Sequence, residues 1–335
     1  MKPYLETPPK LSISFTETCN LRCRHCYADC RASCENELRT DEWLEFLDYL
    51  SARNFIQVYI EGGEPLHRPD ALEILARAAR DMMTLLRTNG TLIDAAMAKE
   101  LRRVGVGRTF VDVMGATAAT HDWFTQTEGS FERSCAAVER LRAAAIPCDL
   151  LVILTRRNAH EINDILALAK RLGAERVGVL RLYPLGRAKA IWSEIALSLE
   201  EQSAVIRALA PPEGVSVMQS WHPFDRNCCW QAATVNARGD SIGCNYLREY
   251  VNFGNIRRQD FIEIWRTNPH YRDLRAGRVD QSCPDCSRSQ GTDGGCRAAA
   301  YAFRGDWRAP DPYCETLNNG VDLRVLPKRL LRQGA

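Results

Sequence analysis

The sequence has no apolar run that approaches the roughly 18 residues needed to cross a membrane as a helix. It also begins without the apolar segment of a secretory leader. Lysine is scarce, so arginine carries most of the basic charge, and the formal net charge is only +2 over 335 residues. This near balance excludes the strong positive field typical of a polyanion-binding protein. We therefore expect a cytoplasmic protein with no membrane or nucleic-acid partner.

Cysteine, by contrast, is abundant, with fourteen residues in the chain. In a reducing compartment, cysteines in such numbers indicate metal binding rather than disulfides. The length and a hydrophobic content of 45% suit one large domain with a smaller one beside it.

Three of these residues, Cys19, Cys23 and Cys26, are spaced as C-x3-C-x2-C directly after an alternating apolar run at 11–15. Thiolates bind iron–sulfur clusters, and a cubane held by three of them keeps one iron for another ligand. Zinc sites usually add a second ligand pair downstream, and none follows within about twenty residues. The spacing therefore favours an iron–sulfur loop, with zinc or a disulfide framework as weaker alternatives.

Short apolar runs alternate with amphipathic segments over the first two thirds of the chain. This rhythm predicts a parallel sheet with helices outside, either an open barrel or a doubly wound sheet. The predicted strands are 11–15, 57–60, 83–87, 108–113, 149–154 and 176–182, and the predicted helices are 41–52, 70–80, 93–103, 131–144 and 161–172.

Ligands of such folds gather at the carboxyl ends of the strands. The cysteine loop follows the first predicted strand, Gly62-Gly63-Glu64-Pro65 the second, and Asn89-Gly90 the third. Paired glycines let the backbone approach a ligand closely. Plain turns explain both glycine-containing segments equally well.

These residues together resemble the radical S-adenosylmethionine (SAM) superfamily. The resemblance implies a partial (β/α)6 TIM-like barrel at 1–220, in which Cys19, Cys23 and Cys26 hold a [4Fe–4S] cluster. The free iron of that cluster would bind SAM, and Gly62, Gly63, Glu64, Pro65 and Asn89 would lie against it. Strand four departs from the family pattern, because Asp112 stands where SAM-ribose contacts are usual. Met114 replaces an inward acid there, and a core methionine is its simpler explanation.

In the last third, cysteine returns at Cys228, Cys229, Cys244, Cys283, Cys286, Cys296 and Cys314. Taken alone, the C-x2-C pair could belong to a zinc ribbon. With Gly239, Trp265 and Gly294-Gly295-Cys296, the spacing resembles the SPASM auxiliary-cluster domain, which we place at 221–320 with a tail at 321–335.

The resemblance implies one or two auxiliary iron–sulfur clusters. One would use Cys229 or Cys228 with Cys244 and Cys296, and the other Cys283, Cys286 and Cys314. Thr292 stands where the family has a further cysteine, so we hypothesise that Asp293 supplies an oxygen ligand.

The implied activity is reductive cleavage of SAM to a 5′-deoxyadenosyl radical, which abstracts hydrogen from an unactivated C–H bond. Ferredoxin or flavodoxin would supply the electron. Cys30 and Cys34 are candidate hydrogen-atom donors, although inert thiols are common. Arg181 and Arg187 could clamp a substrate anion, but strand-end arginines are more often solvated.

We expect a ribosomally made peptide as substrate, with a separate leader-binding protein as a further partner. A tetrapyrrole side chain, or a sugar or nucleoside natural product, is the alternative. A non-catalytic iron–sulfur or zinc regulator is the alternative of another class, and it predicts a basic patch that the sequence does not show.

Overall fold

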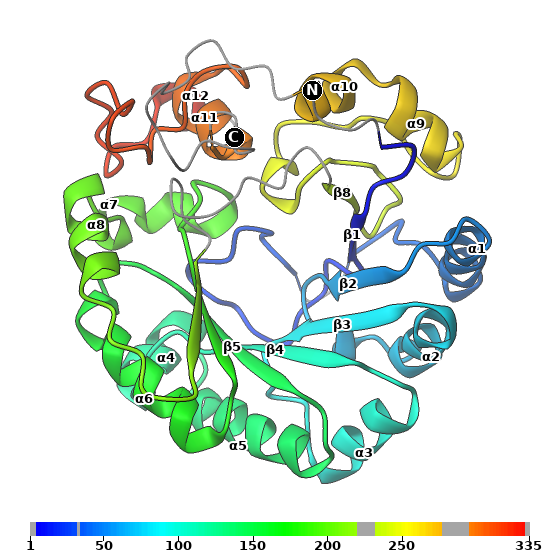
Figure 1. The fold of residues 1–335 in the computed structure, drawn as a ribbon, viewed down its shortest axis with the longest axis horizontal. Helices are drawn as coiled ribbons and strands as arrows, with labels where there is room; N and C mark the ends of the chain where they lie inside the picture. Colours follow the sequence, from blue (N-terminus) through cyan, green and yellow to red (C-terminus); the bar gives the residue numbers. More distant parts are fainter. Residues whose placement is uncertain (1–4, 32–33, 220–231, 277–294, 332–335) are drawn as a thin grey trace.

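Eight parallel strands form one sheet in the computed structural model, and helices cover the outer face of that sheet (Figure 1). The structure describes residues 5–31, 34–219, 232–276 and 295–331. The strands are β1 (Lys10–Ser14), β2 (Gln57–Glu61), β3 (Met83–Thr88), β4 (Arg108–Asp112), β5 (Cys148–Ile153), β6 (Arg176–Leu180), β7 (Ser216–Gln219) and β8 (Ala232–Val235).

The strand order across the sheet is β8-β1-β2-β3-β4-β5-β6-β7. From β1 to β6 each strand lies beside its predecessor, so every crossover advances in the same direction and leaves its helix on the same face. A doubly wound sheet would reverse its order at a switch point. The fold is therefore the predicted partial barrel, and β7 and β8 form the edges of a sheet that is not closed.

The first helices alternate with the strands as predicted, and Figure 1 shows them along the outer arc of the barrel. The helices are α1 (Thr40–Ser51), α2 (Ala71–Asp81), α3 (Ala95–Arg103), α4 (Ala118–Thr125), α5 (Ser130–Ala143), α6 (Ile162–Leu172), α7 (Trp192–Ile195), α8 (Leu199–Arg207), α9 (Phe261–Thr267), α10 (Pro269–Ala276), α11 (Arg297–Arg304) and α12 (Lys328–Leu331).

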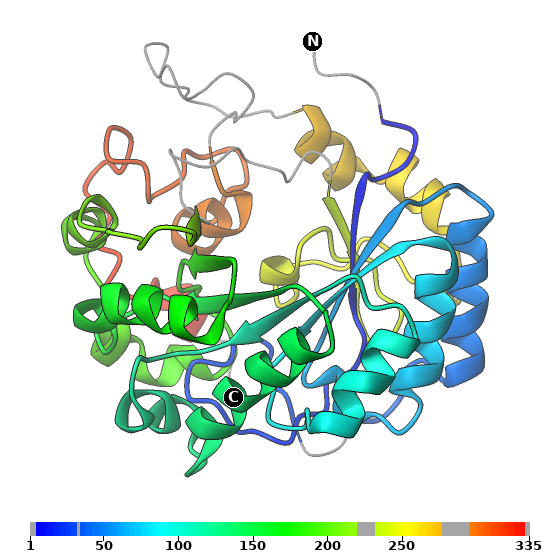
Figure 2. The same ribbon diagram turned by 60° about the horizontal axis from the view of Figure 1, so that its bottom comes forward.

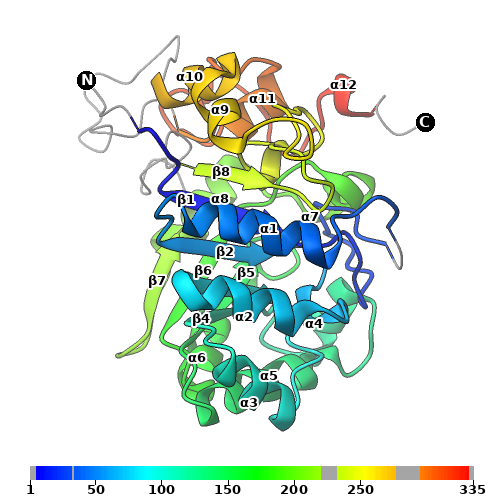
Figure 3. The same ribbon diagram turned by 90° about the vertical axis from the view of Figure 1, so that its right-hand side faces the viewer.

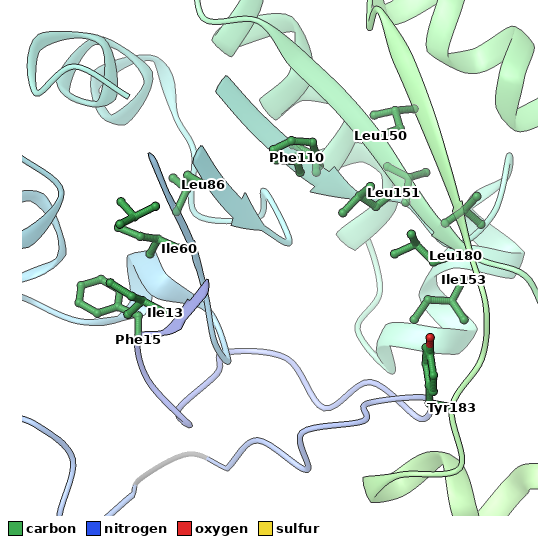
Figure 4. Packing of buried hydrophobic residues seen from close by; sticks show 14 of the residues in the cluster. Ile13, Phe15, Ile60, Leu86, Phe110, Leu150, Leu151, Ile153, Leu180 and Tyr183 are labelled. Carbon is green, nitrogen blue, oxygen red and sulfur yellow. The ribbon is translucent and has the colours of Figure 1, made fainter. Parts of the chain in front are cut away.

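Helix α6 illustrates why these segments fold as they do. Ile162, Ile165, Leu166 and Ala169 recur at helical spacing and are all buried against the sheet. The helix ends at Gly173, whose φ of 75° is in the left-handed region that glycine adopts without steric cost. Figure 4 shows the buried side chains that neighbouring strands contribute to the same core.

The C-terminal part of the chain packs against both edges of the barrel. β8 pairs with β1 and so extends the barrel sheet, although it belongs to the segment predicted as the second domain. Near this edge, Phe261 of α9 meets Phe46 of α1 edge to face, with ring centres 5.6 Å apart. Figure 3 shows α9 and α10 above β8.

At the opposite edge, α11 lies beside α7 (Figure 2). The ring of Phe303 is 6.1 Å from that of Trp192, and the indole N–H of Trp192 donates to the carbonyl of Leu323. No helix within the described ranges is long and apolar enough to cross a membrane.

Candidate active site

One cavity at the carboxyl ends of the barrel strands contains most of the residues predicted to bind the cofactor. Its empty space, part of which is open to solvent, amounts to about 760 Å³. Its walls consist of Cys19, Leu21, Cys23, His25, Cys26, Tyr27, Ala28, Cys30, Glu61, Gly62, Gly63, Arg87, Thr88, Asn89, Asp112, Met114, His121, Thr125, Ile153 and Arg187.

The loop that carries the three cysteines is fixed at both ends. A short parallel bridge joins Thr18 to Arg31, and the N–H of Cys19 donates to the carbonyl of Arg31 at 2.9 Å. Arg187 donates from its side chain to the carbonyl of Cys23 and from its backbone to the carbonyl of Cys26. Arg187 therefore orders the cysteine loop rather than clamping a substrate anion.

The glycine pair passes so close to this loop that no side chain fits. A Cβ on Gly63 would lie 1.8 Å from the carbonyl oxygen of Thr18, and one on Gly62 would lie 2.6 Å from that of Thr16. The N–H groups of Gly63 and Glu64 already donate to these two carbonyls. Because these N–H groups are engaged, a ligand amino group bound here would donate to the backbone carbonyl oxygens of the Gly62–Pro65 segment.

Glu64 is fully buried outside the cavity and ties the second loop to the third. Its carboxylate accepts hydrogen bonds from the N–H groups of Leu66 and Asn89 and from the hydroxyl of Thr88. Burial raises the pKa of Glu64 to about 7, although these hydrogen bonds favour the charged form. Pro65 begins the short 3₁₀ turn that follows. Glu64 thus does not line the cavity itself but fixes the backbone of Asn89, which does.

Three charged side chains from neighbouring strands meet inside the barrel. Arg87 donates to Asp112 at 2.9 Å and lies 3.5 Å from Glu61. The hydroxyl of Tyr27 and the amide of Asn245 also donate to Glu61. Burial raises the pKa of Glu61. Asp112, which we predicted for the SAM ribose, lines the cavity as an ion pair with Arg87.

Two buried histidines also line the cavity. Burial lowers the pKa of His25 to about 3 and that of His121 to about 4, so both rings are neutral at pH 7. Nδ1 of His121 accepts the N–H of Met114, which assigns the proton to Nε2. Nδ1 of His25 and Nε2 of His121 have no hydrogen-bond partner within the described residues.

Glu61, Arg87, His25 and His121 were missed in the sequence. The alternation in strands two and three offered a signal, because Glu61 and Arg87 are charged residues at the carboxyl ends of otherwise apolar strands.

The comparisons with known proteins agree with this geometry. The chain matches the radical SAM superfamily over residues 13–169 and an iron–sulfur cluster-binding domain, SPASM, over residues 228–287. It is 34% identical to an AdoMet-dependent heme synthase of Methanosarcina barkeri, over 92% of this chain and 96% of that protein. The chain belongs to the radical SAM superfamily.

Two further proteins are similar over most of this radical SAM chain. The PqqA peptide cyclase of Gluconobacter oxydans is 28% identical, over 92% of this chain and 91% of its own. The crystal structure of Streptococcus suis SuiB bound to S-adenosylmethionine has a TM-score of 0.75 at 16% identity, and covers 93% of this chain and 78% of its own. This second likeness concerns the fold alone.

Membership of the family makes the protein an enzyme with a [4Fe–4S] cluster, SAM and auxiliary iron–sulfur binding. The non-catalytic regulator is thereby excluded. The donor set fits these groups: three thiols share one cavity with two unpartnered imidazole nitrogens. Among the described residues, no three Cys, His, Asp or Glu side chains converge on a single ion. A cubane places each thiolate on a different iron and so accepts wider spacing.

The structure separates the two candidate hydrogen-atom donors. Cys30 is buried and lines the cavity beside Cys26. Cys34 lies in a different groove, where its thiol contacts Glu17 at 3.2 Å and Arg238 at 3.5 Å. Only Cys30 is therefore within the cavity that also contains the three loop thiols.

On the C-terminal side, Cys244, Cys296 and Cys314 are described and partly or fully buried. Cys296 caps α11, because its sulfur accepts the N–H of Ala299. The nearby Arg181 does not face solvent but forms a buried ion pair with Asp311 at 2.9 Å. The remaining predicted ligands lie outside the described residues: Cys228, Cys229, Cys283, Cys286 and Asp293.

Proposed function

We propose that Cys19, Cys23 and Cys26 bind the [4Fe–4S] cluster, and that SAM binds beside it along Gly62–Pro65, Asn89 and Asp112. The observation that carries this proposal is that the three thiols and the paired glycines line the same cavity. The glycines lie so close to the backbone of the cysteine loop that neither position has room for a side chain. When bound, the cluster and SAM supply a 5′-deoxyadenosyl radical that removes a hydrogen atom from an unactivated C–H bond.

The chain's own contribution is to hold and shield these reactants. Leu21, Met114 and Ile153 give the cavity apolar walls, and charged lining residues are paired with one another, as Arg87 is with Asp112. A water-poor site protects a reactive radical from side reactions. Arg187 and the Thr18–Arg31 bridge keep the cysteine loop in place against the barrel.

Anaerobic reconstitution followed by reduction with dithionite tests this assignment. We expect 5′-deoxyadenosine from SAM, and loss of at least 100-fold of that product in Cys23→Ala, because the cluster chemistry disappears with its ligand. Cys135→Ala is the matched control, since Cys135 lies on α5, outside the cavity. Equal product from Cys23→Ala and the unaltered protein would refute the assignment.

For the substrate, we favour a tetrapyrrole that carries carboxylate side chains. The heme synthase of M. barkeri is the relative reported above with the higher identity and coverage. The guanidinium carbons of Arg24 and Arg157 lie 4.9 and 4.4 Å from the ring centre of Trp123. Neither forms an ion pair with a described residue, so both can receive substrate carboxylates.

A peptide is the second candidate substrate. The similarity to a PqqA peptide cyclase over 92% of the chain supports it, and this reading also calls for a separate leader-binding partner. In both cases ferredoxin or flavodoxin would supply the electron.

The two substrates are distinguished by mass spectrometry. The reduced enzyme is incubated with SAM and either a propionate-bearing tetrapyrrole or a short peptide encoded beside its gene. We expect the tetrapyrrole to lose carbon dioxide together with one hydrogen atom, which passes to the 5′-deoxyadenosyl radical, and one electron, which an auxiliary cluster would accept. Trp123→Ala should bind the tetrapyrrole more weakly. A mass change confined to the peptide would overturn the tetrapyrrole proposal.

For the auxiliary clusters, we propose Cys244 and Cys296 with Cys228 or Cys229 for one, and Cys283, Cys286 and Cys314 with Asp293 for the other. Asp293→Ala should lower the iron content and alter the cluster spectrum. Unchanged iron and an unchanged spectrum would rule out Asp293 as a ligand.

A further inference from the structure

The sulfur of Cys296 is approached by two hydrogen-bond donors. The N–H of Ala299 lies 3.5 Å from it within the first turn of α11, and the hydroxyl oxygen of Tyr183 lies 3.3 Å from it. A thiolate can only accept hydrogen bonds, so Tyr183 is the donor whenever Cys296 is deprotonated. The N–H of Cys296 donates to Asp311 at 2.8 Å and fixes the residue in this position.

Tyr183 is held in place by a second tyrosine. Its ring is buried and stacks on that of Tyr246, with ring centres 3.9 Å apart and planes inclined by 11°. Tyr246 comes shortly after Cys244 and also contacts Tyr27, at 5.2 Å, in the wall of the cavity. Figure 4 shows Tyr183 beyond the end of the strand that carries Leu180.

We propose that Tyr183 raises the reduction potential of the auxiliary iron–sulfur cluster bound by Cys296, through its hydrogen bond to the ligand sulfur. A reduced cluster carries more negative charge than an oxidised one, so a donor to its sulfur stabilises the reduced form more. A raised potential suits a group that accepts an electron, and therefore a reaction with net oxidation of the substrate. This inference depends on the proposed role of Cys296 as a ligand.

The test is a redox titration of the full-length, anaerobically reconstituted protein, followed by electron paramagnetic resonance. Tyr183→Phe keeps the stacked ring and removes only the hydroxyl. We expect its auxiliary-cluster midpoint potential to shift to a more negative value, with iron content unchanged. Tyr250→Phe is the matched control, because the hydroxyl of Tyr250 donates to the carbonyl of Pro184 and not to sulfur. Its midpoint should equal that of the unaltered protein.

An unchanged midpoint in Tyr183→Phe would overturn the inference. Should that variant fail to assemble its cluster, Tyr183→Leu replaces it, since this change also removes the hydroxyl but relieves the packing against Tyr246. A negative shift then supports the inference, and no shift overturns it. Cys296→Ala tests the ligand assignment separately from the role of Tyr183. Retention of all iron and of the auxiliary-cluster signal in this variant would refute Cys296 as a ligand.

Discussion

At the scale of single residues, Gly63 is a position where one added carbon has a large effect. Its Cβ would meet backbone atoms of Thr18, and backbone cannot rotate away as a side chain can. We expect Gly63→Ala to displace the cysteine loop, lower the iron content of the reconstituted protein and reduce the melting temperature. Iron analysis and thermal denaturation measure both effects.

Gly107→Ala is the matched control for this change. A Cβ on Gly107 would lie 3.5 Å from its nearest neighbour, which is ordinary contact. Iron content should stay at the level of the unaltered protein. If Gly63→Ala also retains full iron, the close approach does not position the loop.

Arg87 compensates two carboxylates inside the barrel. Replacing one partner of a buried ion pair leaves the other charge uncompensated, at a cost of about 3–5 kcal/mol. We expect Arg87→Met to lower the free energy of unfolding by about 3 kcal/mol, because Glu61 is almost fully buried. Urea denaturation measures this loss.

Arg103→Met provides the comparison, since Arg103 pairs with Glu100 on an exposed helix face. Its effect should be too small to resolve by the same denaturation experiment, because solvent screens an exposed ion pair. Equal effects of the two substitutions would mean that the charges inside the barrel are well solvated.

The sequence predicted the three loop thiols, which now line one cavity, because their spacing is local and their chemistry is specific. Asn89 and Asp112 line the same cavity. The partners of Asp112 and Glu61 were not predictable. The charged residues at the ends of these strands are visible in the sequence, but their pairing is not. Arg87 contacts Asp112 on the neighbouring strand, and Asn245 comes from the C-terminal part of the chain.

At the scale of elements, Glu42 on α1 connects this helix to the C-terminal part of the chain. Its carboxylate accepts hydrogen bonds from Arg257 at 2.6 and 2.8 Å. These bonds lower the pKa of Glu42 to about 2, compared with about 4.3 in an unfolded chain. The stabilisation is therefore complete above about pH 5 and is lost as the pH falls toward 2.

We expect Glu42→Gln to lower the free energy of unfolding at pH 7 by about 1 kcal/mol, because the pair is partly exposed. The difference from the unaltered protein should shrink between pH 5 and pH 3, because Glu42 of the unaltered protein becomes protonated in the unfolded chain over this range. Urea denaturation at several pH values checks this. A difference that is independent of pH would attribute the effect to packing.

The six predicted strands of the barrel are present, because buried parallel strands are apolar runs bounded by turn residues. β7 and β8 were not predicted, since each has only four residues. Ala232–Val235 becomes a strand because the exposed edge of β1 is available to it.

At the scale of the whole molecule, β8 makes the boundary predicted near residue 220 a poor place to divide the chain. A protein that ends at Gln219 lacks β8, so the backbone donors and acceptors on one side of β1 lose their partners. Unprotected edges of this kind promote aggregation.

We expect the truncation at Gln219 to be mostly insoluble, and a truncation at Asn236, which retains β8, to be more soluble. Sedimentation of the expressed proteins compares the two. Equal solubility would mean that the barrel is stable without its eighth strand.

The pairing of β1 with β8 also has a consequence for biosynthesis. The ribosome completes the loop that carries Cys19 early, whereas β8 emerges more than 200 residues later. At about 5–20 residues per second, this interval lasts roughly ten to forty seconds. During that time the backbone donors and acceptors on one side of β1 have no strand partner, so the barrel sheet is completed only after most of the chain has been synthesised.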